Sequence, residues 1–237
     1  MDCRHLHLAK AGGECVCGLR FPGFFTPPYP PPLIAYASRT GTRRNLAMLR
    51  LHGWRLLVSA AGALRHEGFP FALDNGAWSA FTQGRPFDER SFARALRMMG
   101  PGADWTVIPD IVAGGPASLD LSLRWMRRVL DETPRALIAV QNGLECRDVR
   151  PFLGSRVGIF VGGDTQWKLS TLPGWAALGR EVGCWVHVGR VNTRQRILAC
   201  TAAGAHSFDG TSASRYAVNV RPLDLARREV LSLEGAR

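Results

Sequence analysis

A chain of 237 residues with a hydrophobic content of 46% is long enough to form one large α/β domain. No apolar run approaches the roughly 20 residues that a membrane-spanning helix needs, and no charged-then-apolar leader opens the sequence, so we expect a cytoplasmic protein without membrane association. The 30 basic and 19 acidic residues give a net charge of +11, which favours attraction to a polyanion such as nucleic acid.

Residues 1–32 are predicted to form an irregular segment, because five prolines between positions 27 and 32 remove hydrogen-bond donors and fix φ. From residue 33 onward, short unbroken apolar runs alternate with helical patterns. Such runs are typical of parallel strands that are buried on both faces. We expect eight of these strands, at residues 33–37, 55–60, 71–74, 105–109, 136–140, 157–161, 184–188 and about 206–208.

Helical patterns occupy several of the connections. Asp88 is a suitable N-cap for a helix that the Gly-Pro-Gly sequence at 100–102 ends, and Pro116 begins a long helix with apolar residues at helical spacing. Other helices are expected at 45–51, 193–203 and 222–231. Eight strands with helical connections predict a single (β/α)8 barrel over 33–237, in preference to an open doubly wound sheet.

Six of the apolar runs stop abruptly on a polar or glycine-containing step. In a parallel barrel the carboxyl ends of all strands lie on one face, which is where active sites are built. We therefore expect the polar residues at these ends to meet in one cavity. They are Asp74, Asp110, Gln141, the pair Gly162 and Gly163, Arg190 and Asp209.

Asp209 and Asp74 are the candidate catalytic residues. On its own stretch, Asp209 could be a turn aspartate or a helix N-cap, and Asp74-Asn-Gly could be an ordinary tight turn. The Asn-Gly pair leads to Trp78 and not to an alternating partner strand, which weakens the hairpin alternative. Two carboxylates at strand ends can divide a glycosyl displacement between a nucleophile and a general acid/base.

The remaining polar residues are candidate substrate contacts. A carboxylate at Asp110, an amide at Gln141 and bare backbone N–H groups at Gly162 and Gly163 form a set suited to binding a purine edge. A lone histidine within an apolar run is more often a core residue, whereas an arginine at a strand end must find a partner or water. The other candidates are Lys168, His187, Arg190, Asn192 and Arg215.

A metal site is not expected. The weak candidates are Cys3, His5, His7, Cys15 and Cys17, whose gaps are tighter than those of structural zinc sites. The glycine pairs lack the spacing of nucleotide-binding motifs, so we expect no cofactor.

In chain order, six segments resemble the barrel of the tRNA-guanine transglycosylase superfamily, over roughly residues 33–220. The likeness is nearest to the short phage (DpdA-like) branch, which is associated with inserting 7-deazaguanines into DNA. The segments are Asp74-Asn-Gly-Ala-Trp, Val-Ile-Pro-Asp110, Gln141-Asn-Gly, Val-Gly162-Gly-Asp-Thr-Gln-Trp-Lys168, His187-Val-Gly-Arg-Val-Asn192 and Phe-Asp209-Gly-Thr.

The resemblance implies a role for each matched residue. Asp209 matches the nucleophile that attacks the anomeric carbon and expels guanine, and Asp74 matches the general acid/base. The purine-binding positions match Asp110, Gln141 and the glycine pair. An incoming 7-deazaguanine then takes the sugar, so two displacements retain the configuration. The host cytoplasm would be the location of a phage-encoded member.

The chain differs from the tRNA enzymes of that superfamily in two ways. They carry a C-terminal zinc site with several cysteines, whereas no cysteine follows Cys200 here, and Asn75 and Ala77 stand where their first motif has glycines. These differences favour DNA as the substrate. A tRNA substrate, a non-catalytic nucleic-acid-binding barrel that assists a partner subunit, and a sugar hydrolase are the alternatives.

Overall fold

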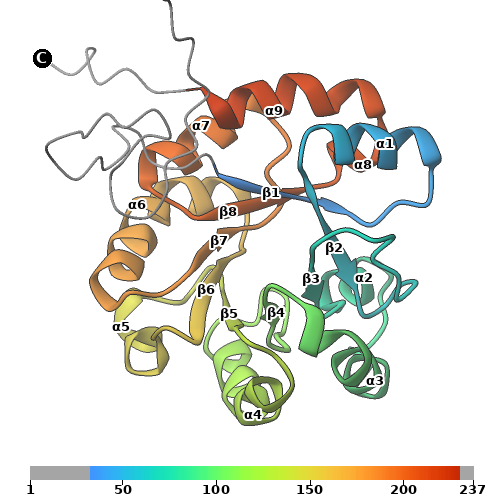
Figure 1. The fold of residues 1–237 in the computed structure, drawn as a ribbon. Helices are drawn as coiled ribbons and strands as arrows, with labels where there is room; N and C mark the ends of the chain where they lie inside the picture. Colours follow the sequence, from blue (N-terminus) through green and yellow to red (C-terminus); the bar gives the residue numbers. More distant parts are fainter. Residues whose placement is uncertain (1–32, 230–237) are drawn as a thin grey trace, which may run out of the picture. The chain divides into compact units, whose positions relative to one another are not determined.

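The computed structural model describes residues 33–229, which form a closed barrel of eight parallel strands in sequence order (Figure 1). Each strand pairs with the next, and β8 returns to pair with β1. The predicted (β/α)8 barrel is confirmed. The predicted irregular segment at 1–32, with its cysteine and histidine candidates, lies outside the described residues.

The strands lie close to their predicted positions, with one clear exception. The fourth strand is shorter than predicted: only Thr106 and Val107 have strand partners. The N–H of Ile108 still donates to Leu137 (2.9 Å), and the pairing stops at Pro109, which has no N–H to donate. The strands are β1 (Ile34–Ser38), β2 (Arg55–Ser59), β3 (Phe71–Asp74), β4 (Thr106–Val107), β5 (Ala136–Val140), β6 (Val157–Val161), β7 (Val186–Val188) and β8 (Ser207–Gly210).

The helices ring the barrel (Figure 1). Those expected from sequence are found as α1 (Arg43–Leu51), α3 (Glu89–Met99), α4 (Pro116–Glu132), α7 (Arg194–Ala203) and α9 (Val220–Arg228). The helices that the sequence patterns missed are α2 (Ala77–Thr82), α5 (Cys146–Val149), α6 (Thr165–Val182) and α8 (Ser212–Arg215). Three short 3-10 turns complete the connections: η1 (Gly100–Gly102), η2 (Arg150–Phe152) and η3 (Ala217–Asn219).

Helix α6 is the longest element that sequence patterns missed. Pro173 and Gly174 lie in its middle and suggest a break, yet the helix continues between two well-formed ends. Asp164 caps its start by accepting a hydrogen bond from Trp167 N (2.9 Å), and Gly183 ends it in the left-handed conformation. Within residues 33–229, no helix is both long and apolar enough to cross a membrane.

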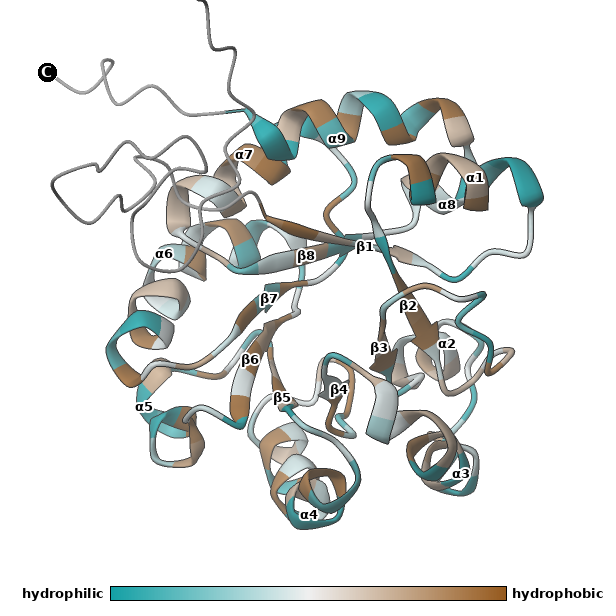
Figure 2. Ribbon diagram, in the orientation of Figure 1, coloured by the Kyte–Doolittle hydropathy of each residue, from teal (hydrophilic) through white to brown (hydrophobic). Residues whose placement is uncertain are grey.

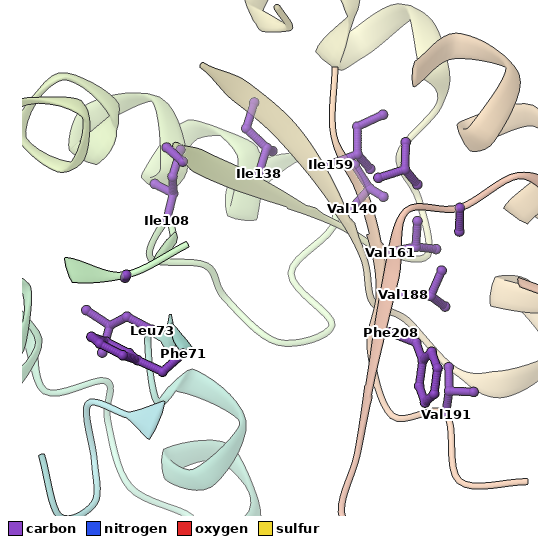
Figure 3. Packing of buried hydrophobic residues seen from close by; sticks show 14 of the residues in the cluster. Phe71, Leu73, Ile108, Ile138, Val140, Ile159, Val161, Val188, Val191 and Phe208 are labelled. Carbon is purple, nitrogen blue, oxygen red and sulfur yellow. The ribbon is translucent and has the colours of Figure 1, made fainter. Parts of the chain in front are cut away.

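Alternation along the strands divides the buried side chains into two sets. One set fills the layer between the barrel and the helices, and includes Ile138, Ile159 and Phe208 (Figure 3). The other set packs inside the barrel: Tyr36, Leu57, Ala72, Trp105, Val107, Leu137 and Ala139. Figure 2 shows hydrophobic colours along the strands, while the surrounding helices mix hydrophobic and hydrophilic residues. The interior is therefore a packed core whose apolar filling gives way to polar groups at the carboxyl ends.

Candidate active site

A cavity of about 740 Å³ opens at the carboxyl ends of the strands. Nine of the eleven residues predicted for the site line it: Asp74, Asp110, Gln141, Gly162, Gly163, Arg190, Asn192, Asp209 and Arg215. Lys168 and His187 do not line it; both are buried beside it. A volume of this size falls in the usual range for small-molecule sites.

The two-residue period of the strands aims the catalytic candidates at this cavity. Ala72 and Ala139 pack inside the barrel, so the side chains two residues later, Asp74 and Gln141, face the same way. On β8, Phe208 packs outward, so its neighbour Asp209 points inward. The convergence of these side chains thus follows from strand alternation and parallel register.

Asp209 is almost fully buried and is held through a single oxygen. Its Oδ1 accepts hydrogen bonds from His187 Nε2 (3.1 Å) and from the backbone N–H of Arg190 (3.3 Å). Among the described residues, no donor is found on Oδ2. One carboxylate oxygen is therefore anchored, and the other is available to a substrate.

A chain of hydrogen bonds fixes the tautomer of His187. Trp185 Nε1 donates to Ser207 Oγ (2.9 Å), and Ser207 Oγ lies 2.8 Å from His187 Nδ1. Because a carboxylate only accepts, the proton of His187 must be on Nε2, and its Nδ1 accepts the hydroxyl proton of Ser207. Every N–H or O–H in this series of hydrogen bonds therefore points towards Asp209.

The surroundings of His187 keep it uncharged. The rings of Trp105 and Phe160 lie 4.5 Å and 4.9 Å from the imidazole, centroid to centroid, and the side chain is fully buried. Burial lowers the pKa of His187, and the contact with Asp209 opposes this only in part. A neutral donor at this position holds Asp209 without adding a second charge to the core.

Asp74 has fewer donors and more negative neighbours. Its Oδ2 accepts a hydrogen bond from the backbone N–H of Gly76 (3.0 Å). Burial, and after it the negative charge of Asp209, raise the pKa of Asp74 to about 6. A carboxyl group with that pKa holds a proton for part of the time near neutral pH, as a general acid/base requires.

Asn75 is a site residue that sequence patterns missed. In the sequence it stands out only because the first motif of the tRNA enzymes has a glycine there. Its Nδ2 donates to Asp110 Oδ1 (2.7 Å) and to the carbonyl of Ile108 (2.8 Å), while its Oδ1 accepts from Ala77 N (2.8 Å). Burial raises the pKa of Asp110 to about 6, although the Asn75 bond acts in the opposite direction. The sequence carried no local signal for this bond, since Asp110 is 35 residues away from Asn75.

Gln141 uses its amide to hold the loop that follows β4. Its Oε1 accepts from Ala113 N (2.6 Å), and its Nε2 donates to the carbonyl of Ile111 (2.7 Å). Ala113 has a positive φ of 59°, which non-glycine residues rarely adopt, and the amide pair stabilises that loop. One Nε2 proton and one lone pair of Oε1 are left for a ligand.

The glycine pair after β6 is less open than predicted. The expectation of two bare N–H groups is wrong for Gly162, whose N–H donates to the carbonyl of Val140 (2.8 Å) and extends the sheet. Gly163 has a φ of 70°, and a Cβ there would come within 2.6 Å of the Trp167 ring. Glycine at this position is therefore required by both its φ and the packing of α6.

Arg190 links three parts of the site. Its φ of 59° places a non-glycine residue in the left-handed region, and this conformation aims its N–H at Asp209. Its guanidinium donates to the carbonyl of Gly163 and lies 4.1 Å above the centre of the Trp78 ring. The side chain thus crosses the cavity edge from β7 to α2.

The other basic and amide candidates occupy different depths. Lys168 is buried and donates to the carbonyl of Gly189; burial, and after it the charge of Arg190, lower its pKa to about 8. Asn192 Oδ1 accepts from Ser212 N (2.9 Å) and so fastens the loop after β7 to α8. Arg215 lies exposed at the end of α8, at the cavity edge.

No group of three or more His, Cys, Asp or Glu side chains within residues 33–229 is placed to hold a metal ion. No protein-family model matches the sequence, and no curated protein matches it either.

Proposed function

We propose that the chain is a base-exchange transglycosylase that replaces guanine in DNA with a 7-deazaguanine derivative through a covalent aspartyl-sugar intermediate. The observation that carries the proposal is a division of labour between two carboxylates in one cavity. Asp209 is anchored through Oδ1 and free at Oδ2, whereas Asp74 has a pKa of about 6. This combination suits a nucleophile and a general acid/base.

In the first displacement, Asp209 Oδ2 attacks the anomeric carbon of the target nucleotide. The bond from that carbon to the purine nitrogen breaks, its electron pair stays on the base, and Asp74 supplies the proton that lets guanine leave neutral. The hydrogen bonds from His187 and Arg190 hold Oδ1 while Oδ2 changes its bonding.

In the second displacement, the incoming 7-deazaguanine returns the sugar to a base. Asp74, now ionised, removes the proton from the ring nitrogen of the incoming base, and that nitrogen attacks the anomeric carbon. The ester bond to Asp209 breaks and the carboxylate is regenerated. Two inversions retain the configuration at the sugar.

We assign purine binding to the side of the cavity where β4 and β5 end. Asp110 accepts or donates according to its protonation, since its pKa is about 6, and Asn75 fixes the orientation of its carboxyl group. Gln141 sets the shape of the adjoining loop and keeps one N–H for the base. Access requires the target nucleotide to leave the base stack or to be single-stranded, at a cost of about a few kcal/mol.

The net charge of +11 supports a polyanionic substrate. The test is incorporation of radiolabelled guanine, or of a labelled 7-deazaguanine, into DNA by the wild-type protein, with tRNA offered under equal conditions. We expect exchange into DNA, and Asp209→Asn should lower its rate by at least about 10³-fold. Full exchange by Asp209→Asn would contradict the assignment of Asp209 as the nucleophile. Exchange into tRNA alone would contradict DNA as the substrate.

A further inference from the structure

A second cavity, of about 600 Å³, lies beside the first, between the β2–β3 connection, α2 and the start of α3. Asn75 and Ser79 line both cavities, so the two spaces share a rim along α2. We call the second cavity the arginine groove. Nothing in the two displacements uses it.

Three arginines define the charge of the arginine groove: Arg65, Arg85 and Arg94 line it and are exposed. None of them makes an ion pair with a carboxylate of the described residues, although Arg39, Arg55 and several other arginines do. Asp88 is the one carboxylate in the lining, and it caps α3 by accepting from Ser91 N (3.0 Å). Three guanidiniums and one carboxylate leave the groove with a net charge of +2.

The helix between the cavities exposes two aromatic rings on its other side. Trp78 and Phe81 are 43% and 54% exposed, line the catalytic cavity, and have centroids 5.8 Å apart. Large apolar rings left in solvent at a cavity edge mark a contact surface. The guanidinium of Arg190 lies over the Trp78 ring.

An unpaired cationic groove beside exposed aromatic rings is the combination that binds single-stranded nucleic acid, whose phosphates need cations and whose bases need π-faces. We propose that a single-stranded segment of DNA next to the target nucleotide crosses α2, stacks a base on Trp78 and Phe81, and places its phosphates in the arginine groove. The inference rests on the proposed function for the identity of the target nucleotide. The path of the strand across α2 rests on the charge of the arginine groove and on the exposed rings.

The test compares the binding of a fluorescent single-stranded DNA across a range of salt concentrations for three proteins. Arg65→Gln/Arg85→Gln/Arg94→Gln removes the charge of the groove. Arg124→Gln/Arg127→Gln/Arg221→Gln removes the same charge from exposed positions on α4 and α9 that line neither cavity. Each phosphate contact contributes about 0.7 to the salt slope of single-strand binding, so the groove variant should lose about 2 and the control much less.

We expect the groove variant to bind DNA at least tenfold more weakly and to have a raised KM for DNA with an unchanged kcat. Equal weakening by both triple variants, or no weakening by either, would overturn the inference. Replacement of the same three arginines by lysine should restore the salt slope, and it also reports whether the glutamine variant failed only by misfolding. Preference for RNA over DNA in the same assay would overturn the proposal that the bound strand is DNA.

The two proposals fail separately. If the wild type exchanges no guanine but the groove variant still loses affinity, the groove stands and the transglycosylase assignment fails. If the wild type exchanges guanine while the groove variant matches the control, the assignment stands and the strand does not follow this path. Trp78→Ala/Phe81→Ala should weaken binding without changing the salt slope, because stacking carries no charge.

Discussion

Asp209, at the end of β8, and Asp74, at the end of β3, face one cavity but have different surroundings. Asp209 receives two N–H donors on one oxygen, and a chain of donors that begins at Trp185 supports the first of them. Asp74 has one backbone donor and the negative charges of Asp209 and Asp110 near it. Equal side chains at equivalent strand ends thus acquire different properties from the residues around them.

The largest expected effect concerns the donor chain on the Asp209 side. His187→Phe keeps an aromatic ring of similar size in the pocket but removes the N–H that holds Oδ1. We expect kcat to fall by about 10- to 100-fold, with little change in KM for DNA, because His187 positions the proposed nucleophile and lines no part of the cavity.

Ser207→Ala provides the graded control. It removes only the partner that fixes the His187 tautomer, so a smaller loss of kcat is expected. Steady-state exchange kinetics measure both variants. A His187→Phe enzyme with the wild-type kcat would show that Asp209 needs no support from β7.

A smaller effect tests the electrostatic cost of ionising the buried Asp74 carboxyl group. The raised pKa means that the native state binds this proton more tightly than the unfolded chain does, so stability falls as pH rises from about 4 to about 6. Asp74→Asn should remove that penalty and raise the free energy of unfolding by about 1–2 kcal/mol at pH 8.

Denaturant unfolding at pH 5 and pH 8 measures this change. Part of the pH dependence of stability should persist in Asp74→Asn, because the pKa of Asp110 is also raised. Asp88→Asn is the control, since Asp88 is exposed and its pKa is lowered by Ser91. A destabilised Asp74→Asn protein would contradict the claim that the ionised Asp74 carboxylate is costly.

The smallest effect separates Asp110 from the two carboxylates proposed to be catalytic. Asn75→Ala removes the donor to Asp110 and should raise its pKa further. We expect KM for the free base to rise about fivefold at neutral pH, with the rate of the first displacement little changed. Exchange assays at varied concentrations of free base measure it, and an unchanged KM would mean that Asp110 is not part of the base site.

The sequence predicted the barrel because alternation and short apolar runs depend on local burial, as at 136–140 and 157–161. The same alternation predicted which side chains meet. It could not predict their partners: the donors on Asp209 come from a residue 22 positions earlier and from a strained backbone N–H at Arg190. Nor could it show that the Gln141 amide is used by a loop 28 residues away.

Local signals also misled where tertiary packing overrides propensity. Helix α6 continues through Pro173 because its two caps and its buried face, which includes Leu172 and Trp175, outweigh one broken hydrogen bond. The role of Asn75 depends on a tertiary contact, because its Nδ2 donates to Asp110, which is 35 residues away in the sequence.

Trapping the covalent intermediate tests the central claim most directly. The wild-type protein is incubated with a guanine-containing single-stranded oligonucleotide without an incoming base, denatured and digested, and the adduct is located by mass spectrometry. The account predicts one sugar adduct on the peptide that contains Asp209, and none from Asp209→Asn. An adduct on Asp74 or Asp110, or release of guanine with no adduct, would contradict it.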